Sequence, residues 1–199
     1  MLFRSRIETG SAAPIKQPAR RLPIQQRAVV EEEIQSMLKK GVIKPATGPW
    51  ASPIVLVRKK NGKVRFCVDY RRLNEVTRKD AYPIPRIDDT IDALSGSRFF
   101  STLDLASGYW QVPMDDEHKE KTAFASASGL YQFEVMPFGL CNAPSTFERL
   151  MDHVLRGLQW QLCLVYLDDI IVYSSSFDEH MRRLDLIFRR IDRKSTRLN

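Results

Sequence analysis

Two adjacent acidic residues between apolar runs are the feature of this sequence best suited to chemistry. Asp168 and Asp169 stand between the apolar residues 162–165 and 170–173. These β-prone runs predict a tight hairpin with both carboxylates at its tip. Ionised carboxylates that lie close together repel each other unless a cation sits between them, and Mg²⁺ prefers oxygen ligands. The pair therefore indicates a metal site, although Asp also tolerates ordinary turn geometry.

A third acid, Asp104, stands at the end of another apolar segment. Residues 99–103 are typical of a strand, and the chain turns after Asp104 through Ser107-Gly108. Three carboxylates from two strands could hold two metal ions. One ion would activate an attacking hydroxyl group, and the other would stabilise a leaving pyrophosphate.

Six blocks of sequence resemble the reverse transcriptase of gypsy-class LTR retrotransposons, relatives of retroviral polymerases. They follow the order and spacing of that family and comprise residues 48–53, 67–74, 82–89, 103–109, 136–144 and 166–169. The resemblance implies an RNA-directed DNA polymerase fragment of a Pol polyprotein. Such a fragment would add dNTPs to a primer 3′-hydroxyl on an RNA or DNA template by two-metal nucleotidyl transfer.

The mixture of helices and strands lacks regular βαβ alternation and predicts an α+β fold with a mainly antiparallel sheet. The resemblance implies polymerase-type fingers and palm with packed helices and without a thumb. Asn61-Gly62 between apolar runs predicts a hairpin over 54–69. A second hairpin is expected around Ser128-Gly129, over 122–127 and 130–135. Helices are expected over residues 25–40, 86–94, 144–158 and 178–191.

Three segments follow from this reading of the chain. Residues 1–24 contain three prolines and predict an extended arm or linker. Residues 25–191 are expected to form one truncated fingers–palm domain, with residues of about 25–80 largely in the fingers and the carboxylates on the palm sheet. Residues 192–199 depart from the family pattern and are expected to be a non-native or disordered tail.

The composition favours a polyanionic partner and an intracellular protein. Lys and Arg exceed Asp and Glu by 31 − 24 = 7, and residues 58–79 carry nine cations against two acids. That segment predicts a phosphate-facing surface, with a solvated strand face as the equal alternative. No apolar run approaches the ~20 residues that span a bilayer. The N-terminus lacks a signal peptide, and three cysteines fit neither a disulfide scaffold nor a zinc site.

The resemblance implies roles for individual residues. Asp104 and Asp168 would bind two Mg²⁺ ions, with Mn²⁺ as the alternative, and Asp169 and the carbonyl group of Leu105 would complete the ligand set. The residues expected to bind the dNTP are Lys59, Arg65, Ala106, Ser107, Gly108, Tyr109 and Phe138. Those expected to contact nucleic acid are Lys60, Lys63, Arg71, Arg72, Arg78, Lys79, Gly139, Asn142, Pro144 and Tyr166.

Several of these residues have a structural alternative. Each basic residue could be an ordinary surface cation, and helix capping would equally explain Asn142 and Pro144. Tyr109 would lie under the sugar and obstruct a 2′-hydroxyl, or it would be a core aromatic beside Trp110. Phe138, where retroviral relatives often carry Gln, can make only apolar contacts. The acidic residues 115–117 predict a solvated loop or helix start more than a metal site.

The implied partners are an RNA or DNA template–primer and dNTPs, with no membrane. RNase H, integrase and protease domains would lie elsewhere in the parent polyprotein. The resemblance places the protein in the cytoplasm, in retroelement particles. The alternative of a different class is a catalytically inactive, truncated relic that at most binds nucleic acid through its basic fingers.

Overall fold

The chain folds into two compact units. The computed structural model describes residues 3–58, 62, 64–105, 108–166 and 169–198, with side chains through residue 192. The N-terminal unit comprises residues 4–79 and 109–143, and the C-terminal unit comprises residues 1–3, 80–108 and 144–199. The expectation of one fingers–palm domain over residues 25–191 stays a prediction.

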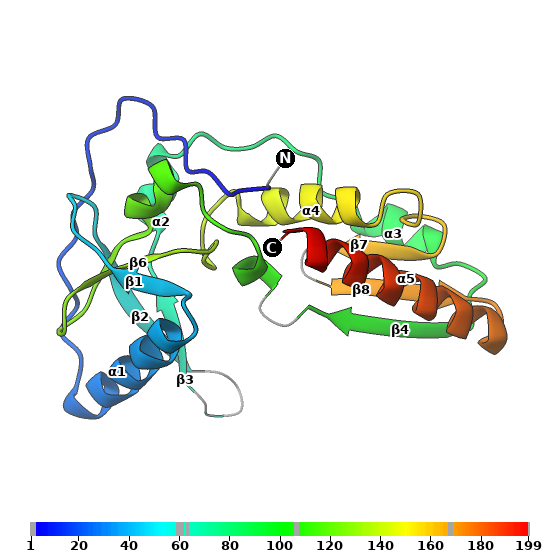
Figure 1. Ribbon diagram of the computed structural model, residues 1–199, viewed down its shortest axis with the longest axis horizontal. Helices are drawn as coiled ribbons and strands as arrows, with labels where there is room; N and C mark the ends of the chain where they lie inside the picture. Colours follow the sequence, from blue (N-terminus) through cyan, green and yellow to red (C-terminus); the bar gives the residue numbers. More distant parts are fainter. Residues whose placement is uncertain (1–2, 59–61, 63, 106–107, 167–168, 199) are drawn as a thin grey trace. The chain divides into compact units, whose positions relative to one another are not determined.

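A five-stranded sheet and one long helix form the core of the N-terminal unit (Figure 1). The sheet order is β1-β6-β5-β2-β3, and every pairing is antiparallel except that of β2 with β5. The strands are β1 (Ile43–Pro45), β2 (Ser52–Arg58), β3 (Val64–Val68), β5 (Phe124–Ala125) and β6 (Leu130–Phe133). Helix α1 (Ile24–Lys39) buries Ile34 and Met37 in a cluster with Phe124 of the sheet. Both predicted hairpins and the predicted first helix are confirmed, although β5 is only two residues long.

Shorter elements connect these strands. Helix α2 (Arg71–Val76) follows β3, and two 3₁₀ helices, η1 (Gly108–Gln111) and η2 (Asp116–Thr122), precede β5. Asp115 caps η2, because its carboxylate accepts a hydrogen bond from the Glu117 backbone N–H. The acidic run at residues 115–117 is therefore a helix start, as its sequence predicted.

The N-terminal arm is extended, but it is not a free linker. Ser5 pairs with Met114, and Lys16 pairs with Ala51, each in an isolated bridge. The Ile7 side chain is only 2% exposed. Because an apolar side chain is buried along this segment, the arm packs on the N-terminal unit.

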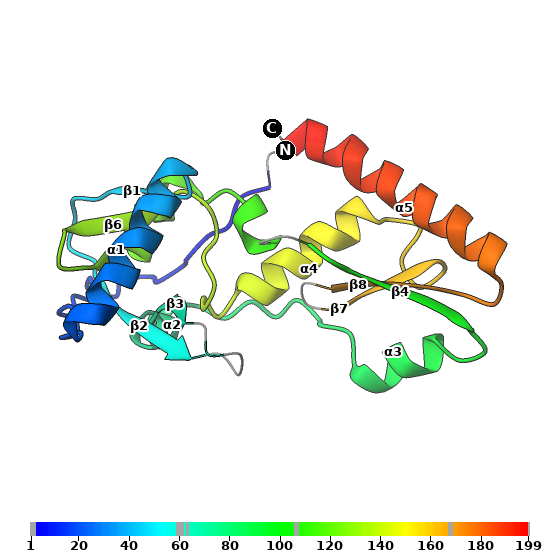
Figure 2. The same ribbon diagram turned by 90° about the horizontal axis from the view of Figure 1, so that it is seen from below.

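A three-stranded antiparallel sheet forms the centre of the C-terminal unit. Its order is β4-β8-β7, with β4 (Phe99–Asp104), β7 (Cys163–Tyr166) and β8 (Asp169–Ser174). The helices are α3 (Ile87–Ala93), α4 (Ala143–Val154) and α5 (Phe177–Leu198), and α5 lies along the sheet in Figure 2. The Ser101 hydroxyl of β4 lies 2.8 Å from His180 Nε2 of α5. This contact fixes which face of β4 the helix covers.

Two helix ends differ from their prediction. Helix α4 ends at Val154 rather than near residue 158, and Gly157 then adopts a left-handed conformation with φ of 80°. Helix α5 continues to Leu198, so the backbone of residues 192–198 is helical. The helical backbone departs from the disordered alternative for this tail, and the non-native alternative stays a prediction. No helix in the described ranges is long and apolar enough to cross a membrane.

Truncating Phe124 should destabilise the N-terminal unit strongly. Its side chain is 0% exposed, and its ring centroid lies 5.5 Å from that of Phe133 and 5.6 Å from that of Phe66. Phe124→Ala should lower the free energy of unfolding by about 3–5 kcal/mol, since it leaves a cavity among packed rings. Ile24→Ala, at a position 83% exposed, should change it by less than about 0.5 kcal/mol. Urea denaturation measures both, and equal effects would contradict this core assignment.

Candidate active site

The backbone register brings two of the three predicted acids together. Asp104 is the Cα partner of Asp169 in the antiparallel pairing of β4 with β8, and both residues are exposed. Residues directly opposite each other in such a pair have Cβ atoms about 4.5–5.5 Å apart. The two carboxyl groups are therefore close enough to share a ligand.

The hairpin that carries the acidic pair is confirmed. Tyr166 of β7 pairs with Asp169 of β8, so the two strands form the predicted hairpin. Asp168 itself lies outside the described residues, and its predicted role stays a prediction. Side chains alternate between the faces of a strand, so Asp104 faces away from the side on which Ser101 meets α5. The carboxylates thus stand on the sheet face opposite that helix.

Neither Asp104 nor Asp169 has a cationic or hydrogen-bonding partner among the residues that the structure describes. Other acids of this unit differ, since Asp80 accepts two hydrogen bonds from Arg149 at 2.6 and 2.8 Å. Like charges directly opposite each other on two strands disfavour the pairing. A hard divalent cation would remove that repulsion, and carboxylate oxygens are the donors that Mg²⁺ prefers. The carboxylates of Asp104 and Asp169 are therefore ligands of the type that such an ion needs.

The turn after Asp104 is built around a glycine. The Gly108 backbone N–H donates to the Leu105 carbonyl oxygen at 2.9 Å. A Cβ at Gly108 would lie 3.1 Å from Cζ of Phe147 in α4, so a larger residue would collide with that ring. The Leu105 oxygen keeps one lone pair for the predicted metal contact. Ala106 and Ser107 lie outside the described residues.

Within the N-terminal unit, three residues predicted to bind the nucleotide pack together. The Arg65 guanidinium lies 5.3 Å from the centroid of the Phe138 ring, and the Tyr109 ring centroid is 5.0 Å from it. Arg65 and Phe138 line a cavity of about 340 Å³, together with Trp110 and Gly139. Tyr109 is only 8% exposed, which agrees with the core-aromatic alternative, and its predicted contact with the sugar stays a prediction. The cation–π contact is electrostatic, so Phe138 does more than make the apolar contacts expected of it.

The loop that carries Phe138 is held by an asparagine for which no role was predicted. Asn74 donates from Nδ2 to the Gly139 carbonyl oxygen at 2.8 Å and accepts from the Cys141 backbone N–H at 2.9 Å. Asn142 donates to the Arg78 carbonyl oxygen at 2.8 Å. Gly139 has φ of 93°, a left-handed conformation that favours glycine. Asn142 thus orients the loop, while Pro144 lies in the first turn of α4 as predicted.

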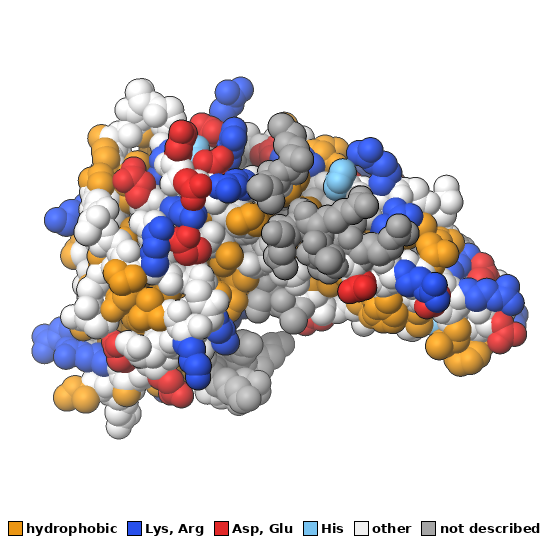
Figure 3. Space-filling view, viewed as in Figure 1, with side chains coloured by type: hydrophobic (Ala, Val, Ile, Leu, Met, Phe, Trp, Pro, Cys, Tyr) orange, Lys and Arg blue, Asp and Glu red, His pale blue; other side chains and the backbone are white. Residues whose placement is uncertain are grey.

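The residues predicted to contact nucleic acid differ in whether a neighbouring carboxylate already neutralises their charge. Arg71 donates to both oxygens of Asp69, at 2.7 and 2.8 Å, and this hydrogen bonding lowers the pKa of Asp69 to about 2. Arg72, Arg78 and Lys79 are exposed, whereas Lys59, Lys60 and Lys63 lie outside the described residues. Figure 3 shows basic and acidic side chains interspersed on the viewed face of the N-terminal unit. The positive charge is therefore partly neutralised locally.

One other group of potential metal ligands occurs among the described residues. Ligand atoms of Asp115, Glu117 and His118 lie within 4.8 Å of one another. Protein groups already engage two of them: Asp115 accepts from Arg6 Nε at 2.9 Å, and His118 Nδ1 lies 2.7 Å from the Ile7 carbonyl oxygen. These contacts agree with the prediction that the acidic run is a helix start rather than a metal site.

A buried carboxyl group in α4 was not singled out by the sequence. Glu148 is 1% exposed, and Oε1 accepts from Gln159 Nε2 at 3.5 Å. Burial raises the pKa of Glu148 to about 7, and the nearby Asp152 carboxylate adds to this effect. In the sequence, only the position of Glu148 at the edge of the apolar helical stripe could have indicated that it is buried. That stripe consists of residues 147, 150, 151 and 154.

The profile described as Reverse transcriptase (RNA-dependent DNA polymerase) matches residues 57–199. The Retrovirus-related Pol polyprotein from transposon 297 of Drosophila melanogaster is 46% identical over 167 residues, which cover 81% of this chain and 16% of that protein. The corresponding polyprotein from transposon opus of the same species is 40% identical over 201 residues. These residues cover 98% of this chain and 20% of that protein. The chain thus spans about a fifth or less of the length of these relatives.

Solved structures of the prototype foamy virus protease-reverse transcriptase have a similar fold. The native crystal structure has a TM-score of 0.83 at 27% identity, covering 96% of this chain and 25% of that one. The foamy viral complex with dsDNA has a TM-score of 0.80 at 26% identity, and the match covers 94% of this chain and 39% of that one. The complex with RNA/DNA hybrid shares the fold at 24% identity, with a TM-score of 0.81 and coverage of 94% and 25%. This similarity confirms the predicted fingers-and-palm fold.

Removing one charge of the Asp104–Asp169 pair should stabilise the metal-free protein. Asp104→Asn or Asp169→Asn should raise the free energy of unfolding by about 0.2–1 kcal/mol in EDTA, because it ends the repulsion across the strand pair. Mg²⁺ should then raise the Tm of the original chain more than that of either variant. Asp88→Asn, on the exposed first turn of α3, is the control. Differential scanning calorimetry that finds both variants destabilised and equally Mg²⁺-responsive would contradict the cation site.

Glu148 should make the stability of the fold depend on pH. Its folded-state pKa of about 7 exceeds its ordinary value of 4.5, so the folded protein binds more protons than the unfolded chain between these values. Stability should therefore fall as pH rises from about 4.5 through 7, by up to about 3 kcal/mol. Glu148→Gln should remove that loss, whereas Glu75→Gln, at an exposed position, should retain it. Urea denaturation at pH 5 and pH 8 in EDTA measures the difference, and parallel profiles for all three proteins would refute it.

Proposed function

This chain belongs to the reverse transcriptase (RNA-dependent DNA polymerase) family, of the gypsy class, and on that premise we propose that it carries the fingers and palm of an RNA-directed DNA polymerase. The parent would be a longer Pol polyprotein that also holds RNase H, integrase and protease domains. The observation that carries the proposal is the pairing of Asp104 with Asp169 at the end of the β4–β8 ladder without a described counter-cation.

In the proposed reaction, the oxygen of a primer 3′-hydroxyl forms a bond to the α-phosphorus of a dNTP. The bond from that phosphorus to the pyrophosphate oxygen breaks, and the hydroxyl proton leaves. When bound, two Mg²⁺ ions would supply charge neutralisation for both oxygens. Asp104 and Asp169, together with Asp168, would hold these ions, and their rigid strands would keep the ligand oxygens in place.

The residues that pack around Phe138 would receive the nucleotide. Arg65 would donate to the triphosphate, because its guanidinium is exposed and forms no ion pair with a described acid. Tyr109 would press against the sugar and disfavour a 2′-hydroxyl. Asn74 would act as a positioning residue, since its two hydrogen bonds hold the loop of Phe138 in one conformation.

The nucleic-acid partners are proposed by analogy with the foamy viral enzyme. That protein has been solved with RNA/DNA hybrid and with dsDNA. The net charge of +7 and the exposed Arg72, Arg78 and Lys79 agree with a template–primer partner for this chain. An intracellular location, in the cytoplasm with retroelement particles, follows from the same proposal.

Mg²⁺-dependent primer extension tests the proposal directly. Asp104→Asn and Asp168→Asn should each lower extension of a DNA primer on an RNA template at least about a hundredfold, because the ligands that position transition-state charge are lost. Asp88→Asn should extend like the original chain, and circular dichroism should show that all variants remain folded. Undiminished extension by Asp104→Asn would refute the metal assignment. An original chain that binds template–primer but extends nothing would establish the alternative, an inactive relic.

A further inference from the structure

Helix α5 carries large apolar side chains on a side that its own unit leaves uncovered. Phe177, Met181 and Phe188 are each at least 50% exposed, whereas Ile187 of the same helix is fully buried. Together with the half-buried Leu184, the three exposed residues are spaced i, i+4, i+7 and i+11, so they form one stripe along the helix. These four residues are called the α5 ridge below. Figure 3 shows apolar side chains on the viewed face in the region of α5 and β4.

The edge strand β4 extends the α5 ridge at the first turn of the helix. The Phe99 ring centroid lies 5.8 Å from that of Phe177, and Phe99 is itself 37% exposed. The contact between Ser101 and His180 holds α5 against this face of β4. The ridge is therefore fixed on a packed sheet, and it runs for about 16 Å along the helix. Apolar anchors at this spacing are the surface to which another helix docks.

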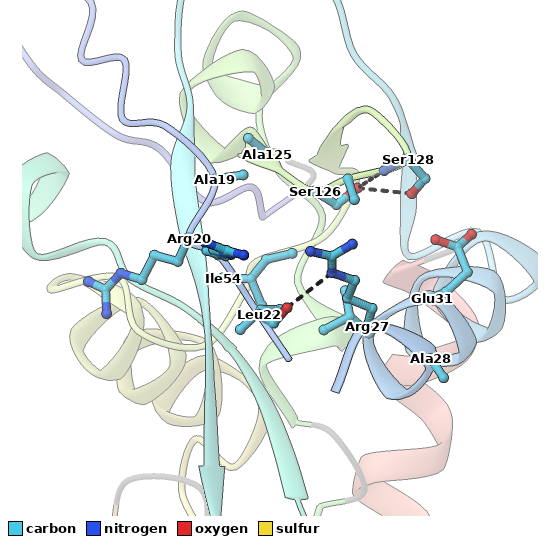
Figure 4. A pocket seen from close by; sticks show the side chains of 13 residues that line it. Ala19, Arg20, Leu22, Arg27, Ala28, Glu31, Ile54, Ala125, Ser126 and Ser128 are labelled. Atoms are coloured by element: carbon cyan, nitrogen blue, oxygen red, sulfur yellow. Dashed lines mark hydrogen bonds between the residues drawn. The ribbon is translucent and has the colours of Figure 1, made fainter. Parts of the chain in front are cut away.

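Helix α1 of the N-terminal unit shows the opposite arrangement. Its Val30, Ile34 and Met37 are at most 5% exposed. Figure 4 shows Leu22 of the arm beside the start of this helix, at a cavity of about 540 Å³, where Arg27 Nε donates to the Leu22 carbonyl oxygen at 3.0 Å. No segment among the described residues covers the α5 ridge in this way. An exposed apolar stripe of this size is typical of a protein interaction surface.

A line of aspartates follows the outer side of the α5 ridge. Asp178, Asp185 and Asp192 are spaced one heptad apart, and all three are exposed. With the ridge residues at heptad positions a and d, these acids take position e, from which ion pairs form between packed helices. Asp185 holds Arg189 at 2.9 Å in an exposed pair, and such a pair exchanges partners at little cost. Arg182 and Arg189 lie farther around the helix, so the flank next to the ridge is acidic.

We propose that the α5 ridge binds an amphipathic helix of a partner protein, whose apolar stripe is flanked by Lys or Arg. The apolar side chains of the partner would pack between Phe177, Met181 and Phe188. Its basic residues would pair with the aspartate line, which would set its orientation and exclude acidic helices. The proposal goes beyond the polymerase reaction, because the paired acids Asp104 and Asp169 stand on the sheet face opposite α5.

Charge disfavours a second copy of this chain as the occupant. A two-fold contact brings the same surface of both copies together. In an antiparallel pair of α5 helices, position e of one copy faces position e of the other, so the two aspartate lines would repel each other. A basic helix meets the same line with attraction. The acidic flank therefore selects a partner of opposite charge.

Fluorescence anisotropy with a labelled synthetic helix tests the ridge. The probe has about three heptads with Leu at positions a and d and Lys at e and g, and its lysines oppose pairing with itself. Met181→Ser combined with Phe188→Ser should weaken its binding at least about tenfold, because the contacting apolar side chains are lost. Leu186→Ser removes an exposed apolar side chain about 160° around α5 from Phe188, and this control should bind like the original chain. Equal affinity of the ridge variant and the control would overturn the proposal.

Exchanging the charge tests the flank. Asp178→Lys combined with Asp185→Lys should weaken binding of the lysine peptide about tenfold, and it should strengthen binding of a matched peptide with Glu at e and g. That gain could not come from misfolding. Asp88→Lys combined with Asp89→Lys, at two exposed acids of α3, changes the net charge equally and should leave the preference for the lysine peptide in place. If both double variants preferred the same peptide, the assignment of a basic partner would be overturned.

Sedimentation velocity distinguishes a second copy from a partner helix. A dimer of the original chain that becomes a monomer in the Met181→Ser and Phe188→Ser double variant would make a second copy the occupant and overturn the proposal. A mass that is the same in the original chain and this variant supports it, and circular dichroism should show equal helix content. Failure here is separate from failure of the polymerase proposal, because peptide binding is measured without Mg²⁺, dNTP or template.

Discussion

The register of β4 against β8 is the constraint on which the candidate active site depends. Leu103 and Ser101 stand opposite the fully buried Ile170 and Val172, and this alternation leaves Asp104 and Asp169 paired at the open end of the ladder. A slip of one residue would turn every side chain of β4 to the other face. The apolar residues that are buried in this unit thus determine where the carboxylates meet, and no contact between the acids themselves is needed.

That register carries a cost in stability, which the rest of the C-terminal unit offsets. Opposed carboxylates disfavour the strand pair, and the buried Glu148 adds a second acid in an unfavourable environment. The Arg149–Asp80 ion pair and the cation–π contact of Arg149 with Tyr82, 4.5 Å from the ring centroid, join the segment before α3 to α4. Residues that destabilise the local structure are expected where a functional site requires them. The opposed acids therefore do not stabilise the strand pair, which agrees with their proposed role as cation ligands.

Local signals in the sequence predicted the elements, and contacts between distant segments account for what it missed. The Asn61-Gly62 turn and the helical stripes lie within windows of a few residues, so the hairpins and α1 were predictable. Asn74 acts on Gly139, 65 positions away, and no local pattern encodes that hydrogen bond. The same reason hid the packing of Ile7, which lies in the extended arm and is only 2% exposed.

Ion pairing, more than net charge, distinguishes the surfaces of the N-terminal unit. Arg4, Arg6 and Arg71 each hold a carboxylate within 3 Å, so much of the positive charge is neutralised where it stands. An exposed pair of this kind contributes little to stability, yet it removes a cation from competition for phosphate. Among the described arginines that line a cavity, Arg65, Arg21 and Arg27 keep no such partner. The free guanidinium group of Arg65, beside the apolar wall of its cavity, therefore supports the proposed contact with the triphosphate.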